Sequence, residues 1–113
     1  MSSFYSLRIE TDESKYEQVS QILGINIIDY SLGWIFETVL NDLDNIDVIT
    51  EYLNLLENNY LSLEQIGVRK EDVSIWLIYE YYNQCNLEFA PETLKRLGEN
   101  GIRFCISCYE GSL

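Results

Sequence analysis

Apolar and polar side chains alternate at the beginning of the chain. Tyr5, Leu7 and Ile9 are apolar, and the residues between them are polar. This period of two is typical of a strand with one buried face. From residue 16 to residue 23, apolar residues recur at helical spacing, and Gly24 follows, a residue that favours a helix end. We therefore predict a strand and then a short helix. Ser14-Lys-Tyr-Glu17 is a candidate capping box for this first helix.

The middle of the chain repeats this change of period. The mostly apolar run 34–40 predicts a second strand, and apolar residues at helical spacing predict the longest helix over 42–58. Residues 62–65 suggest one further helical turn, which Gly67 ends.

The last third of the chain predicts a strand–helix–strand unit. The segments 73–82 and 101–108 are rich in β-branched and aromatic residues, which favour strands. Between them, Pro91 suits a first helical position, and Gly98 is expected to end that helix. The predicted order is strand, helix, strand, helix, strand, helix, strand.

This order predicts an α+β fold with a four-stranded, mainly antiparallel sheet and three helices. We expect a ferredoxin-like arrangement in which the long helix is inserted between the second and third strands. A parallel α/β sheet is the alternative. The third strand is apolar on both faces, so both faces should be covered, at least partly, by the long helix or by another protein.

Length and charge define the class of molecule. A chain of 113 residues predicts one domain, 1–113. Its net charge of −12 opposes binding to nucleic acid or to anionic membranes, and it favours a basic partner or serves solubility. The start of the chain lacks the pattern of a signal peptide, and no apolar run is long enough to cross a bilayer, so we expect a cytoplasmic protein.

The sequence contains no histidine, so it lacks the usual general base at neutral pH and the commonest nitrogen metal ligand. Cys105 and Cys108 have the C-x-x-C spacing, but within a strand they would point to opposite faces, with Cys85 as the only other cysteine. We predict no cofactor, no metal and no catalytic residue. If the protein were an enzyme, Glu37 and Glu80 would be the only candidates.

Four acidic residues form the candidate partner-binding surface. Asp42, Asp44, Asp47 and Glu51 fall at the start of the predicted long helix, three of them on one side. A solvated helix face explains such a group, and so does the favourable helix dipole at that end. The alternative is a docking surface for a basic protein, where complementary charge speeds encounter.

The succession of landmarks resembles a bacterial family of small domains of unknown function, found among immunity proteins of secreted polymorphic toxins. The residues that carry the resemblance are Ile22-Leu-Gly-Ile25, Trp34, Leu53-Asn-Leu-Leu56, Val73-Ser-Ile-Trp76, Phe89-Ala-Pro-Glu-Thr-Leu94, Gly101-Ile102 and Ile106-Ser107. In the family a proline follows the Leu-Gly-Ile segment, where this chain has Asn26. The resemblance implies a binding role and no catalytic residues.

Three functions therefore remain as hypotheses. The first is a non-enzymatic cytoplasmic binding protein, an immunity protein that neutralises a basic toxin through its acidic surface. The second is a small-ligand sensor or a regulatory homodimer, in which Trp34, Trp76 and Tyr82 line a pocket or a two-fold interface. The third is an enzyme that uses carboxylates.

Overall fold

Strands and helices alternate along the chain in the predicted order, with one helix more than expected. The computed structural model describes residues 3–40 and 47–111. Short 3-10 turns, Glu13–Lys15 and Lys70–Asp72, lead into the first helix and the third strand. The elements are β1 (Phe4–Ile9), α1 (Tyr16–Leu23), β2 (Trp34–Val39), α2 (Val48–Glu57), α3 (Tyr60–Gln65), β3 (Val73–Tyr81), α4 (Pro91–Asn100) and β4 (Arg103–Glu110).

The first helix spans the predicted residues, but its start is not capped as the sequence predicted. Gly24 ends α1 in the left-handed conformation, with φ of 68°. The predicted capping box at residues 14–17 is wrong, because no side chain caps α1. Instead, the backbone N–H of Ser14 donates to Asp12 Oδ1 at 2.9 Å. Asp12 therefore caps the preceding 3-10 turn, and α1 continues from that turn.

Three helix boundaries differ from the predictions. Helix α2 begins at Val48, and the predicted residues 42–46 lie outside the described residues. The predicted turn at 62–65 is part of α3, which begins at Tyr60. Helix α4 continues through Gly98 and ends at Gly101, with φ of 67°. Gly98 is compatible with a helix interior, because glycine there costs only about 1 kcal/mol.

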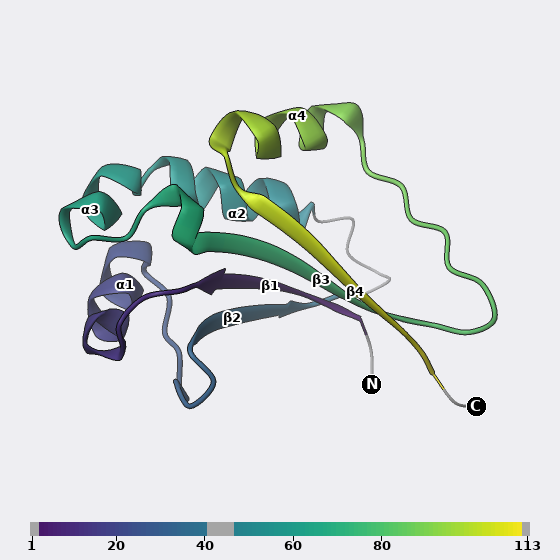
Figure 1. Cartoon of the computed structure of the whole chain (residues 1–113), viewed down its shortest axis with the longest axis horizontal. Helices are drawn as coiled ribbons and strands as arrows, with labels where there is room; N and C mark the ends of the chain where they lie inside the picture. The colour runs from purple at the N-terminus through teal and green to yellow at the C-terminus, as the bar shows by residue number, and fades with distance from the viewer. Residues whose placement is uncertain (1–2, 41–46, 112–113) are drawn as a thin grey trace.

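The four strands form one sheet in the order β2-β1-β3-β4 (Figure 1). Strand β1 pairs antiparallel with both β2 and β3, whereas β3 and β4 are parallel. The sheet is therefore mixed, so the expectation of a mainly antiparallel sheet is met by two of the three strand pairings and not by the third. A ferredoxin-like fold would run β1 and β2 parallel through its first strand–helix–strand unit. Here the chain turns back over residues 24–33, so β2 lies antiparallel beside β1.

The helices lie on one side of this sheet, and the core lies between the two layers (Figure 1). The side chains of Leu7, Trp34 and Ile75 face the helices and are almost completely buried. From the helix layer, Leu53 and Leu56 of α2 contribute to the same core with no exposed surface. Among the described residues, no helix is long and apolar enough to span a membrane.

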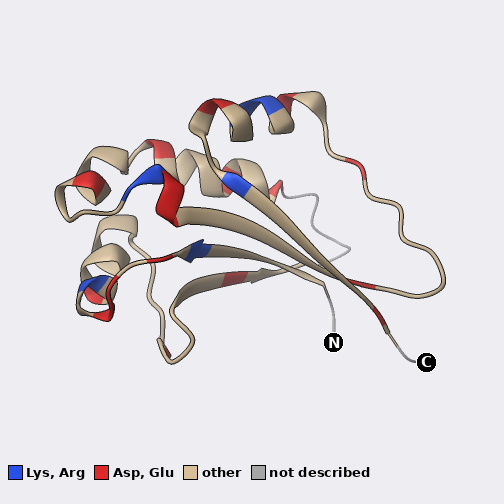
Figure 2. Cartoon of the chain, in the orientation of Figure 1, with Lys and Arg blue, Asp and Glu red and all other residues tan. Residues whose placement is uncertain are grey.

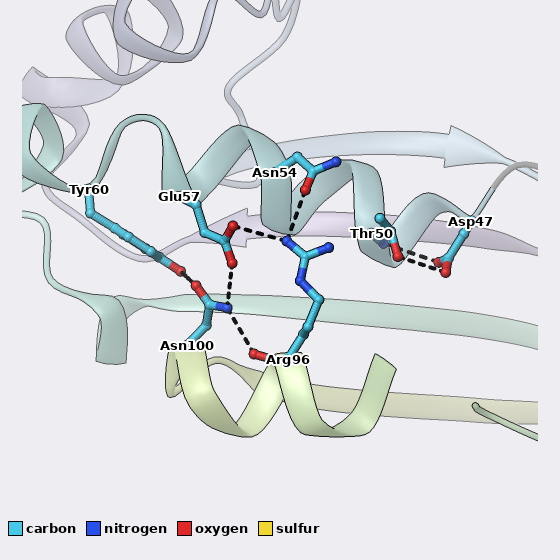
Figure 3. A network of polar contacts seen from close by, with 7 residues as sticks. All are labelled: Asp47, Thr50, Asn54, Glu57, Tyr60, Arg96 and Asn100. Atoms are coloured by element: carbon cyan, nitrogen blue, oxygen red, sulfur yellow. Dashed lines mark hydrogen bonds and ion pairs between the residues drawn. The ribbon is translucent and has the colours of Figure 1, made fainter. Parts of the chain in front are cut away.

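A polar network joins α4 to α2 and α3 at the edge of this core (Figure 3). The amide nitrogen of Asn100 donates to Glu57 Oε2 at 2.9 Å, and its oxygen accepts from the hydroxyl of Tyr60 at 2.7 Å. Arg96 forms an ion pair with Glu57 at 3.0 Å and donates to Asn54 at 2.9 Å. These contacts connect residues about forty positions apart and fix α4 against the rest of the helix layer.

Candidate binding face of the sheet

The face of the sheet opposite the helices is a continuous surface. Alternate residues of each strand point to it, and none of the described helices covers it (Figure 1). The long helix therefore does not cover the second face of β3, and cover by another protein stays a prediction. The strand register assigns to this helix-free face Phe4, Ser6, Arg8, Ile35, Glu37, Val39, Ser74, Trp76, Ile78, Glu80, Arg103, Cys105, Ser107 and Tyr109.

The centre of the helix-free face is apolar. Phe4, Ile35, Trp76 and Ile78 are each half-buried by their neighbours on the sheet. None of them packs against the main core. Beneath this layer Ser6 has no exposed surface. Large apolar side chains that are only half-buried on a monomer favour a contact with something else.

Arg8 is held in one orientation on this face. Its guanidinium carbon lies 4.5 Å from the centroid of the Trp76 ring, a cation–π contact. Its Nε donates to Ser6 Oγ at 3.0 Å. The indole N–H of Trp76 donates in turn to Ser74 Oγ at 3.0 Å. Among residues 3–40 and 47–111, no hydrogen bond or ion pair uses the terminal nitrogens of Arg8.

A second arginine lies in the same row across the sheet. Arg8 is the register partner of Ser74, which is the register partner of Arg103. The backbones of the two arginines are therefore about 10 Å apart, two strand spacings. Both line a hollow of about 440 Å³ at this end of the face. The lining also includes Glu10, Thr11, Tyr16, Leu32, Gly33, Trp34, Ile35, Glu71, Asp72 and Trp76.

The structure assigns different surroundings to the predicted acidic residues. Asp47 caps α2, because its carboxylate accepts from Thr50 N at 3.1 Å and from Thr50 Oγ1 at 2.7 Å (Figure 3). Glu51 is exposed on α2. Asp42 and Asp44 lie outside the described residues. Acidic residues occur on most elements, whereas basic ones are few and scattered (Figure 2).

Glu37 lies near this acidic group. Burial raises the pKa of the Tyr52 hydroxyl to about 12, although a hydrogen bond with Thr38 lowers it, and the charges of Glu37 and Glu51 contribute to the rise. Glu37 belongs to β2, an edge strand, and its side chain is exposed. The charges of Glu37 and Glu51 therefore both act on Tyr52, although Glu37 lies on the helix-free face and α2 on the other side of the sheet.

Glu37 and Glu80 share the helix-free face but do not form one site. Glu37 is paired through Ser6 with Trp76, four residues before Glu80 on β3. With two strand spacings across and four residues along, the two backbones are about 16 Å apart. A single catalytic pair of carboxylates would need them much closer.

The cysteines follow the strand geometry that the sequence predicted. Cys105 lies on the helix-free face and Cys108 on the helix-covered face, because three positions separate them in β4. Burial and contact with the Cys108 thiol raise the pKa of the Cys85 thiol. All three cysteines are free. Among the described residues, no three acidic or cysteine side chains converge as metal ligands would.

Two of the three aromatic residues predicted to line a pocket border the hollow, and the third does not. Trp34 is 1% exposed, and its indole N–H donates to Ser20 at 3.0 Å. Trp34 and Trp76 both border the hollow, whereas Tyr82 lies beyond the end of β3 and does not. Arg8 and Arg103 were not predicted from the sequence. Their polar, outward positions in two strands were a signal, but only the strand order brings them into one row.

Comparisons with known proteins add nothing to this geometry. No protein-family model matches the chain, and searches of curated proteins and of solved structures find no match. The resemblance to the family of small immunity-type domains therefore stays a prediction.

Proposed function

We propose that this protein is a non-enzymatic binding protein that recognises a basic partner protein through the helix-free face of its sheet. Its role would be that of an immunity protein, which neutralises a bacterial toxin by covering its surface. The observation that carries the proposal is the half-buried apolar centre, formed by Phe4, Trp76 and Ile78 and left unpacked by the protein's own helices. Such a layer supplies the apolar core of an interface.

The size of the face supports an interface that continues over the β2 edge. Four strands at about 4.8 Å spacing and about six residues of length give roughly 400 Å², half of the ~800 Å² per partner of a stable complex. At the β2 edge, Val39 is 64% exposed, and Glu37 beside it is exposed too. Continuing past them, the interface would reach Glu51 of α2.

Charge supports a basic partner. The net charge of −12 attracts a basic protein over distances of several ångströms, and it repels an acidic one. Glu37 lies beside the apolar centre on the helix-free face, whereas Glu51 lies on α2, on the other side of the sheet, which the interface would reach around the β2 edge. Asp47 belongs to the same proposed surface, although it also caps α2. Asp42 and Asp44, which the sequence suggested for this surface, lie outside the described residues. The apolar centre would supply affinity, and the acidic border would speed encounter.

A double lysine variant at the β2 edge tests the proposal. The partner is a basic toxin encoded beside this protein, and affinity is measured by calorimetry. Glu37→Lys combined with Val39→Lys should weaken binding at least about tenfold, because it places two cations in the contact. Glu99→Lys on the exposed side of α4 is the control, and it should leave binding nearly unchanged.

Two results would refute the proposal. One is an affinity for the partner that the Glu37→Lys, Val39→Lys variant does not change. The other is a homodimer in sedimentation experiments that this double variant dissociates, because a second copy would then be the occupant of the face.

A further inference from the structure

We propose that the hollow at the end of the helix-free face binds a small ligand with a carboxylate group and a flat apolar body. Arg8 and Arg103 would bind the carboxylate, and Trp76 would contact the apolar body. The hollow holds about 440 Å³, the space of about fifteen waters. That volume lies within the usual range of small-molecule sites. This site shares Trp76 and Ile35 with the apolar centre of the proposed protein interface, but neither arginine belongs to that centre or to the β2 edge.

Arg8 is prepared for a planar anion. The Trp76 ring covers one face of its guanidinium at 4.5 Å, and Ser6 accepts from its Nε at 3.0 Å. The two terminal nitrogens remain, in the geometry that binds both oxygens of a carboxylate. Because stacking already fixes the side chain, binding costs little additional conformational entropy.

Neither arginine of the row has an ion-pair partner among the described residues. In contrast, Arg69 and Arg96 have ion pairs at 2.8 Å and 3.0 Å. Two guanidiniums without such pairs in one row, in a protein with few cations, indicate a position for an anion.

The border of the hollow favours a carboxylate over a phosphate. The side chain of Arg69 pairs with Glu71 at 2.8 Å, and the backbone N–H of Arg69 donates to Asp72 at 2.9 Å. Both carboxylates therefore already have a partner. Their charges, with that of Glu10, still repel a dianion more strongly than a monoanion. Leu32 at the border is 89% exposed and would gain an apolar contact from the ligand.

Three probes of one shape test the chemistry. Benzoate carries a carboxylate, phenyl phosphate carries a phosphate, and benzylamine carries a cation. Each is titrated into the full chain while the indole N–H signals are followed by nuclear magnetic resonance and assigned with Trp76→Phe. We expect benzoate to shift the Trp76 signal saturably. Tighter binding of phenyl phosphate, equal binding of benzylamine, or no saturable shift would overturn the proposal.

Two variants test the arginines. Arg103→Gln removes an exposed cation and should weaken benzoate binding at least about tenfold, the value of a hydrogen-bonded charge. Arg8→Lys keeps the charge but loses the planar fork, so it should also weaken binding. Lys95→Gln, exposed on α4, is the matched control. Unchanged affinity in both arginine variants would refute the site.

The two proposals fail separately. Arg103→Gln should not alter affinity for the basic partner protein, and the Glu37→Lys, Val39→Lys variant should not alter the benzoate titration. Thermal unfolding of each variant verifies that the fold is retained.

Discussion

At the scale of single residues, Asn100 combines the roles of donor and acceptor in a nearly closed space. It is 7% exposed and lies between the Glu57 carboxylate and the Tyr60 hydroxyl. Its amide nitrogen also donates to the carbonyl oxygen of Arg96 at 2.8 Å. A side chain that only accepts hydrogen bonds would not satisfy both carboxylate and carbonyl. The position therefore requires an amide.

We predict that Asn100→Asp destabilises the protein by about 2 kcal/mol near neutral pH. The change replaces a hydrogen bond to Glu57 with two carboxylates in contact, and it leaves the Arg96 carbonyl without its donor. Urea unfolding followed by circular dichroism measures the effect. The double variant with Glu57→Gln should recover part of the loss, because the glutamine amide can donate to the introduced carboxylate. An unfolding free energy equal to that of the unchanged protein would contradict this account.

The same network predicts a dependence on pH. Hydrogen bonds from Asn100 and Arg96, and the Arg96 charge, lower the pKa of Glu57 below its ordinary value of 4.5. A lowered pKa in the folded state adds stability above 4.5, and this stability is lost as the pH falls through the folded value. In Glu57→Gln, stability should therefore fall less steeply on acidification. If the unfolding free energy fell equally steeply with pH in the two proteins, Glu57 would titrate in the folded protein as it does in the unfolded chain.

At the scale of elements, the start of α2 carries one acidic residue that caps the helix, Asp47, and one that does not, Glu51. Apolar residues at helical spacing before Asp47 suggested a longer helix, but the Asp47 carboxylate accepts from Thr50 and sets the beginning at Val48. Helical periodicity does not mark where a helix begins, whereas a side chain that bonds the first free N–H groups does. The two acidic residues at this end of α2 therefore have different roles.

We predict that Asp47→Ala lowers the unfolding free energy by roughly 1 kcal/mol, the usual value of a lost N-cap. Glu51→Ala removes the same charge from the first turn without removing a cap, so it should cost less than about 0.5 kcal/mol. Denaturant unfolding of the two variants compares them directly. Equal losses would mean that charge at the helix end, and not the hydrogen bonds to Thr50, determines stability here.

The elements themselves were largely predictable, because their signals are local. Alternation over Tyr5–Ile9 indicated β1, and Pro91 marked the beginning of α4. Gly98 misled the prediction of the end of α4, since glycine is tolerated inside a helix when Gly101 is available to end it. Local patterns identify an element more reliably than its last residue.

At the scale of the whole molecule, the strand order could not be predicted from the sequence. The parallel pairing of β3 with β4 and the place of β1 between β2 and β3 are contacts between distant segments. The row of Arg8, Ser74 and Arg103 exists only because of that order. The apolar second face of β3 was visible in the sequence, but nothing in the pattern showed whether a helix of the same chain would cover it.

The net charge of the molecule gives a last prediction. The chain has 19 acidic and 7 basic residues, so repulsion acts among most of its charges. At about 0.01 M salt the Debye length is roughly 30 Å, comparable to the 45 × 32 × 24 Å of the molecule. Near 0.15 M it is about 8 Å, and much of the repulsion is screened. Exposed ion pairs such as Arg69–Glu71 also weaken, but they contribute little.

We therefore expect the thermal midpoint to rise by a few degrees when sodium chloride increases over this range. Calorimetry at both concentrations measures it. Replacing Glu17, Glu64 and Glu92, which are all exposed, by glutamine removes three of the twelve net negative charges and should reduce the rise. A midpoint that falls with salt would show that attractive pairs outweigh the repulsion. If the thermal midpoint of the triple variant rose by the same amount, the rise would be a general effect of the salt and not of the net charge.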